Sequence, residues 1–242
     1  MGSIGALLKS LFKAVLYQPL LNLLILFYIY LPGHDFGIAI IVLTIAIRLV
    51  LYPLMAQSIR SQKVLSELQP KIRELQKKYK DDKEKQVKET MDLYKEAKIN
   101  PFGSFLPLLI QLPILIALYQ VFWKGLQPGS MSNLYSFVPN PGVIDPTFLG
   151  LINLSEASII LAFIAGITQF VQTKMMTPAA KTDKGQKASS QISDRMQNQM
   201  LYMLPIFTVF ILWKLPAAIG IYWIVTSLFS IVQQYFILKS SK

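Results

Sequence analysis

Arg48 lies in the middle of an apolar run, FGIAIIVLTIAIRLVLYPLMA, that occupies residues 36–56. About 20 apolar residues are enough for a helix to cross a bilayer, and an arginine at the centre of such a helix costs about 2.5–3.5 kcal/mol. A charge at that depth is typical of a functional site that faces water or a partner, and Thr44 lies one helical turn away on the same face. The alternative is that the side chain reaches back to the basic segment that follows, but its reach is short for that depth.

Glutamine and threonine recur in the other apolar runs, whereas nearly all carboxylates lie outside them. Single residues of these types often only join helices through hydrogen bonds, and we expect that role for part of them. Without an acid inside the membrane, the Arg48 guanidinium needs water, polar partners or a transient guest. A hydrophilic groove open to the cytoplasm would meet this need. The predicted groove residues are Arg48, Thr44, Gln111, Gln169, Gln172 and Gln234.

The chemistry of this set is electrostatic attraction and hydration rather than catalysis. The sequence contains no paired carboxylates, Ser/His/Asp set, HExxH motif or glycine-rich phosphate loop. It also has no cysteine, which excludes a disulfide framework and a thiolate metal site. We therefore predict that the protein is not an enzyme and has no catalytic residue, metal or cofactor.

If the transient guest also contains an apolar segment, that segment would need a second surface on the protein, one that faces lipid. The candidate contact residues are Leu115, Tyr119, Tyr222 and Trp223. Large aromatic and aliphatic side chains serve equally well as packed core, so that alternative stays open.

The elements that must position these residues are membrane helices. The sequence is 53% hydrophobic and 15% charged, a composition typical of polytopic membrane proteins. Residues 1–35 are predicted to form an N-terminal amphipathic, interfacial segment with Lys9 and Lys13 on its polar side. The alternative, in which residues 14–31 cross the membrane as an anchor, stays open. We predict an all-α fold with five transmembrane helices at residues 36–56, 102–123, 157–176, 199–214 and 216–238.

Residues 57–100 form a long charged segment with twelve Lys or Arg and eight Asp or Glu. Apolar residues recur in it at spacings of three and four, from Leu65 to Tyr79 and again from Val87 through Met91, which is the pattern of a heptad seam. Asp81-Asp82 interrupts this pattern, and Pro70 is expected to kink or restart the first arm. We predict a coiled-coil hairpin of two antiparallel helices outside the membrane.

Basic residues mark one side of the membrane. They are concentrated in residues 57–100, in the predicted loop 177–198 and in the short tail 239–242, whereas residues 125–156 have none. By the positive-inside rule, the hairpin, the second loop and the tail are cytoplasmic. The segment 124–156 is then predicted to be an extracytoplasmic loop that caps the helices.

Three stretches carry a resemblance to a known family: IAIRLVLYPLMAQSIRSQKVLSELQPKI (45–72), YKEAKINPFGSFLPLLIQLPILIALYQVF (94–122) and MLPIFTVFILWKLPAAIGIYWIVTSLFSIVQQYFI (203–237). Together with the spacing of the spans, they resemble the YidC family of membrane protein insertases. The resemblance implies a five-helix core around a hydrophilic groove, with Arg48 as the groove arginine. It also implies that the hairpin receives substrate and that an interfacial helix precedes the first span.

The resemblance further implies a bacterial inner or plasma membrane protein whose partners are nascent membrane proteins and the lipid bilayer. A Sec translocon and a translating ribosome are possible further partners, and no sequence-specific nucleic-acid binding is expected. The sequence departs from long members of the family because it lacks a large extracytoplasmic domain before the core. Its tail after Gln234 is short, so the extended basic ribosome-binding tail of some members is missing.

The main functional hypothesis is insertion of nascent membrane proteins without ATP. A second hypothesis is a chaperone or assembly factor that acts only with a Sec translocon. A third, of a different class, is a small-solute transporter that uses Arg48 as an anion site. The third is weakened by the lack of internal repeats and of intramembrane acids.

Overall fold

The computed structural model describes residues 2–100, 103, 106–125, 130–176 and 189–240. In chain order, the elements are α1 (Gly2–Phe12), the π-helical turn η1 (Lys13–Tyr17), α2 (Gln18–Tyr30), α3 (Phe36–Val50), α4 (Tyr52–Lys78), α5 (Lys83–Glu96), α6 (Leu106–Gly125), the 3-10 turn η3 (Ser130–Asn133), β1 (Thr147–Phe148), β2 (Ile152–Asn153), α7 (Ile159–Met176), α8 (Ser189–Leu212) and α9 (Ala217–Ser240). The residues on either side of η1 are helical, so α1, η1 and α2 follow one another without a break.

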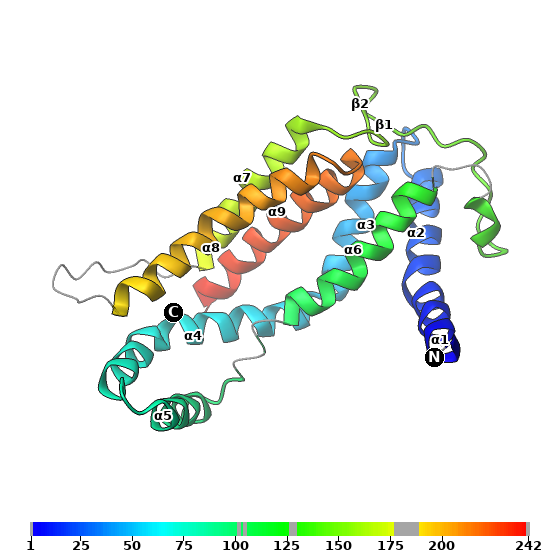
Figure 1. The fold of residues 1–242 in the computed structure, drawn as a ribbon. Helices are drawn as coiled ribbons and strands as arrows, with labels where there is room; N and C mark the ends of the chain where they lie inside the picture. Colours follow the sequence, from blue (N-terminus) through cyan, green and yellow to red (C-terminus); the bar gives the residue numbers. More distant parts are fainter. Residues whose placement is uncertain (1, 101–102, 104–105, 126–129, 177–188, 241–242) are drawn as a thin grey trace.

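Helices α3, α6, α7, α8 and α9 form a bundle, which α2 joins beside α3 (Figure 1). Helix α9 lies at the centre and contacts each of the other four. Fully buried side chains come from distant parts of the sequence and include Leu21 of α2, Ile40 of α3, Leu118 of α6 and Ile219 of α9. One continuous apolar core therefore holds the first and last thirds of the chain together.

Three described helices are long and apolar enough to cross a membrane: Gly5–Tyr30, Ile159–Met176 and Ala217–Lys239. The bent pair α3–α4 makes a fourth candidate, and Leu109–Lys124 and Leu201–Leu212 are shorter apolar helices. The prediction of a mostly helical chain with several membrane spans is confirmed. The N-terminal helix qualifies as a span by length and composition, although the sequence favours an interfacial position for it.

The span predicted at residues 36–56 is not one straight helix. α3 ends at Val50, and α4 continues at an angle of 67° to it. Pro53 explains the bend, because it has no N–H to donate to the Leu49 carbonyl and its ring clashes with the preceding turn. The Met55 N–H then restarts the helical pattern by donating to the Leu51 carbonyl over 3.0 Å. The charged segment is thereby turned away from the bundle directly after Arg48.

Helices α4 and α5 form the pair predicted for residues 57–100, and the Asp82 carboxylate caps α5 by accepting from the Lys85 N–H over 3.0 Å. Pro70 lies within the continuous helix α4, so the expected restart does not occur. Val87 and Met91, which the heptad pattern places on the seam, are 63% and 43% exposed. Figure 1 shows α5 below the later part of α4, next to the turn that joins the two helices.

Helix α8 begins at Ser189, well before the predicted start of the fourth span at residue 199. The early turns have the sequence SSQISDRMQN, which is polar, and hydropathy detects only the apolar part of such a helix. Of the predicted loop 177–198, residues 177–188 lie outside the described residues.

A two-stranded hairpin, β1–β2, is present although the sequence predicts an all-α fold. Leu149 and Gly150 form its turn with φ of 52° and 67°, the positive values that a tight hairpin turn requires. The Leu149 N–H donates to the Asp35 carboxylate over 2.5 Å, and the other oxygen of that carboxylate accepts from the Ile38 N–H over 2.8 Å. Asp35 thus caps α3 and ties the hairpin to it. Strands of two residues are too short for alternation to reveal them.

Gly166 allows α7 and α8 to approach closely, because a Cβ at this position would collide with the Val209 side chain. We expect Gly166→Ala to lower the free energy of unfolding by about 1–3 kcal/mol through overpacking. Val209→Ala should restore much of that loss in the double variant, since it removes the colliding methyl group. Thermal unfolding in detergent measures both effects. Gly5→Ala, which has open space around it, is the control, and strictly additive losses would contradict the contact.

Candidate functional site

Arg48 lies in the last turn of α3, and only 7% of its surface is exposed. Among the described residues, its guanidinium forms neither a hydrogen bond nor an ion pair, and it interacts electrostatically with the Tyr222 hydroxyl of α9. A guanidinium carries five N–H donors in a rigid fork and keeps its charge in proteins. The structure therefore presents a buried cation whose donors are available to a partner that enters.

Gln111 and Tyr222 come together beside Arg48. The Gln111 amide of α6 donates a hydrogen bond to the Tyr222 hydroxyl of α9, which links two helices that are far apart in the sequence. Tyr222 is only 2% exposed, so it lies inside the bundle next to the arginine instead of on a lipid-facing surface. The cluster that the structure assembles is thus Arg48, Gln111 and Tyr222.

Thr44 is buried one turn before Arg48 in α3, as the sequence predicts. Its hydroxyl donates to the Ile40 carbonyl of its own helix over 2.6 Å. A hydroxyl that bonds back into its helix is already satisfied. Thr44 therefore adds polarity near Arg48 without being bonded to it.

The other predicted groove residues lie elsewhere. Gln169 of α7 accepts a hydrogen bond from the Trp223 indole over 2.8 Å, which joins α7 to α9. Gln172, one turn further along α7, is half-buried. Gln234 is buried and its amide oxygen has no hydrogen-bond partner in the described structure, but it follows Tyr222 by twelve residues of helix, about 18 Å. The amide of the neighbouring Gln233 donates to the Tyr52 carbonyl over 3.0 Å, so this part of α9 lies against the start of α4.

Of the predicted contact residues other than Tyr222, only Tyr119 is clearly on the surface. It is 37% exposed and stacks on Trp123, with ring centroids 6.4 Å apart. Leu115 and Trp223 are half-buried against the core. These positions describe exposure only, and the role of the residues as a contact face stays a prediction.

An apolar groove of about 610 Å³ lies between α3, α7 and α9, and the sequence analysis did not single it out. Leu228 and Val232 of α9 are 48% and 54% exposed, and Ile164 of α7 is 40% exposed. The full lining is Ile41, Ile45, Phe148, Leu161, Ile164, Ile221, Ile224, Val225, Leu228, Phe229 and Val232. Hydropathy identifies these residues as part of membrane helices but does not tell which face of each helix is covered. The sequence therefore could not locate the groove.

Metal chemistry finds no support among the described residues, where no group of three His, Asp or Glu side chains comes together. The polar groups inside this part of the bundle are amides, hydroxyls and one guanidinium. These groups attract an anion or hold water, and they have no pKa suited to general acid–base catalysis at neutral pH.

These features define a helical membrane protein with polar groups, among them one guanidinium, buried inside its helix bundle. The chain belongs to the 60Kd inner membrane protein family, whose family model matches residues 27–242. This is the family of the YidC membrane protein insertases, which are not enzymes.

The relatives carry the name membrane protein insertase YidC. The protein of Fusobacterium nucleatum is 36% identical over 205 residues, which cover 85% of this chain and 87% of the relative. That of Clostridium tetani is 39% identical over 202 residues, 84% of this chain and 81% of the relative. That of Geobacter metallireducens is 34% identical over 94% of this chain, but the match covers only 37% of that longer protein.

The contact between Gln111 and Tyr222 can be tested by removing one hydroxyl. We expect Tyr222→Phe to lower the free energy of unfolding by about 1 kcal/mol, because it removes the hydrogen bond that the half-buried Gln111 amide donates to the Tyr222 hydroxyl. Tyr119→Phe is the matched control, since this tyrosine is partly exposed, and it should change stability little. Thermal unfolding in detergent compares the two variants. Equal effects would show that the Tyr222 hydroxyl has no special partner.

Proposed function

We propose that the protein inserts newly made membrane proteins into a bacterial inner or plasma membrane, without ATP, through a hydrophilic groove beside Arg48 that opens to the cytoplasm. The observation that carries this proposal is the burial of Arg48 without a hydrogen-bond or ion-pair partner among the described residues. A buried charge with free donors is costly unless a function requires it. Membership of an insertase family supplies that function.

The distribution of basic residues supports one membrane orientation. We propose that the basic hairpin α4–α5 lies in the cytoplasm and that the cap, which contains β1–β2, lies on the opposite side. α3 then enters from the cap side, and Arg48 in its last turn lies in the cytoplasmic half of the membrane. The bend at Leu51 leads directly from the arginine into the hairpin. A guest received by the hairpin would therefore meet Arg48 next.

Insertion needs a lower barrier, not an energy supply. A guest helix rich in leucine and isoleucine gains roughly 0.3–0.6 kcal/mol per residue when it enters the bilayer. Each charged residue in its flank costs about 3 kcal/mol at the membrane centre. A hydrated groove shortens the distance over which that cost applies, and Arg48 attracts an acidic flank. An inside-negative potential of 100 mV adds about 2.3 kcal/mol for each negative charge moved outward.

The apolar groove between α3, α7 and α9 is the surface that we propose for the apolar segment of the guest. Its lining is almost entirely aliphatic and aromatic, and several of its residues on α7 and α9 are 40–54% exposed. A guest helix there would exchange lipid contacts for protein contacts of the same kind at little cost. Leu115, Tyr119 and Trp223 are the alternative contact face.

A second candidate function is that of a chaperone which shields helices while a Sec translocon moves them. The same apolar groove favours it, because shielding needs an exposed apolar face and does not need Arg48. Nascent membrane proteins are the proposed substrates in both cases. Contacts with a Sec translocon or a translating ribosome would use the hairpin and the second cytoplasmic loop.

The role of Arg48 can be tested in liposomes that contain only the purified protein and carry an inside-positive potential, so that the outer solution corresponds to the negative cytoplasm. A single-spanning guest with two acids in its tail is added to the outer solution, and protection of the tail from external protease measures insertion. We expect Arg48→Ala to lower the insertion rate of the acidic guest about tenfold, equivalent to about 1.4 kcal/mol of barrier. A guest with a neutral tail should be affected much less.

Arg60→Ala is the matched control, because it removes a guanidinium from the exposed face of α4. If both guests are impaired equally by Arg48→Ala, the arginine acts by hydrating the groove and not by attraction. If the wild-type protein crosslinks to both guests but inserts neither the acidic nor the neutral one, the result would contradict autonomous insertion and favour the chaperone function.

The route of the apolar segment can be tested by photocrosslinking. A photoreactive residue at Leu228 in the apolar groove should crosslink an arrested guest at least several-fold more than one at Leu109, which is 64% exposed on α6. A third position, Tyr119, tests the alternative contact face. Stronger crosslinking at Tyr119 than at Leu228 would show that the apolar segment of the guest leaves along α6 instead of through the apolar groove.

A further inference from the structure

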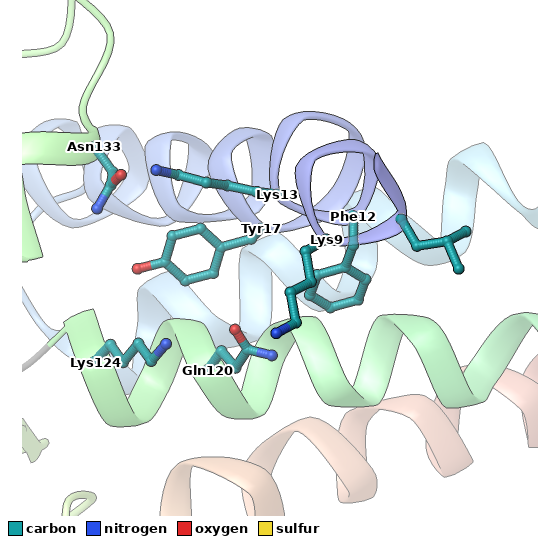
Figure 2. A pocket seen from close by; sticks show the side chains of 8 residues that line it. Lys9, Phe12, Lys13, Tyr17, Gln120, Lys124 and Asn133 are labelled. Atoms are coloured by element: carbon teal, nitrogen blue, oxygen red, sulfur yellow. The ribbon is translucent and has the colours of Figure 1, made fainter. Parts of the chain in front are cut away.

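A second cavity, of about 580 Å³, lies between the N-terminal helix and the C-terminal end of α6. Lys9, Lys13 and Lys124 line it with their amines, and all three side chains are exposed to it or to solvent. Figure 2 shows Lys9 and Lys124 extending from opposite helices towards Gln120 and Tyr17, while the Lys13 amine points along the helix towards Asn133. The lining residues are Leu8, Lys9, Phe12, Lys13, Tyr17, Gln120, Lys124 and Asn133.

The lining of this cavity contains three positive charges and no acidic residue. The acids on the cap side of the chain are engaged elsewhere. Asp35 accepts from the Ile38 and Leu149 N–H groups, Asp145 accepts from the Thr147 N–H, and Glu156 accepts from the Asn153 amide. Three ammonium groups around one cavity repel one another, so an anion that enters gains attraction from all of them.

The surroundings of the cavity match an amphiphilic anion. On the N-terminal helix, Leu7, Leu8, Leu11 and Val15 are 50–65% exposed beside the lysines. An exposed apolar face next to basic residues is the pattern of a helix that lies in the headgroup region of a bilayer, with its leucines among the acyl chains. Tyr17 and Gln120 add a hydroxyl and an amide, which can donate to phosphate oxygens.

The cavity also shows where the N-terminal helix runs. The residues that face Lys9 and Lys13 come from the last turns of α6 and from Asn133, all at the cap end of the bundle, where the rings of Phe36 and Phe122 are in contact with centroids 6.4 Å apart. Figure 2 shows the N-terminal helix running alongside the last turns of α6, and both η1 and α2 contact α6. The cavity therefore lies between two neighbouring helices near the cap end of α6.

We propose that Lys9, Lys13 and Lys124 form a binding site for the phosphate headgroup of an anionic phospholipid in the leaflet at the cap end of the bundle. The acyl chains lie on the exposed leucines of α1, and the headgroup neutralises the three lysines and holds the N-terminal helix against α6. This site is separate from Arg48 and from the apolar groove, so it does not depend on the insertion mechanism.

The test uses the full-length protein in detergent, with phosphatidylglycerol or phosphatidylcholine added, and native mass spectrometry to count retained lipids. We expect the triple variant Lys9→Gln/Lys13→Gln/Lys124→Gln to retain phosphatidylglycerol at least tenfold less than wild type. Retention of phosphatidylcholine should not change. The matched control is Lys80→Gln/Lys83→Gln/Lys88→Gln, which removes the same charge from exposed positions of the hairpin.

Two further measurements keep the proposal falsifiable. Lys124→Gln alone, with its thermal midpoint in detergent recorded, separates lost binding from lost folding, and it should reduce phosphatidylglycerol retention several-fold in a folded protein. Inorganic phosphate is added as a competitor to distinguish the source of the phosphate. Equal losses in the two triple variants, unchanged retention in the cavity variant, or tight binding of phosphate with no preference for the lipid would each overturn the lipid site.

Discussion

The arrangement of the bundle depends on keeping one guanidinium charge inside it. α3 and α6 both pack against α9, and the hydrogen bond from Gln111 to Tyr222 joins α6 to α9. A buried charge is tolerated only where polar groups or a ligand reach it. The Tyr222 hydroxyl is such a group, and it must itself be fixed, which the Gln111 amide does. Other polar contacts between helices lie elsewhere in the bundle, such as those from the Trp223 indole to Gln169 and from the Gln233 amide to the Tyr52 carbonyl.

The cap end of the structure is held by backbone hydrogen bonds. The Glu156 and Leu154 carbonyls accept from the Ala217 and Ala218 N–H groups over 2.7 and 3.1 Å, so the segment before α7 satisfies the first turn of α9. The Asp35 carboxylate accepts from the Ile38 N–H in the first turn of α3 and from the Leu149 N–H in the turn of the β-hairpin. Both helices that contact the arginine are therefore fixed at the end away from it.

Much of the fold was predictable because apolar length and charge carry so much information in a membrane protein. The five apolar segments, the charged helical pair and the burial of Arg48 and Thr44 all follow from residue types and spacing. The exposure of Val87 and Met91, the hairpin β1–β2 and the pairing of Gln169 with Trp223 do not follow, since each depends on contacts between distant segments. Pro53 did signal the bend after Arg48, but a proline within an apolar run reads equally well as a tolerated kink.

The placement of the polar residues argues for separate tasks. Had the predicted glutamines met at one point, a single polar chamber around Arg48 would follow. Instead Gln169 is bonded to Trp223, and Gln234 lies about 18 Å from Tyr222 along α9. A guest moving along α9 would thus meet polar groups in succession, first near Gln234 and then at Arg48. A series of moderate sites suits a protein that must release what it binds, because a single strong site would trap the guest.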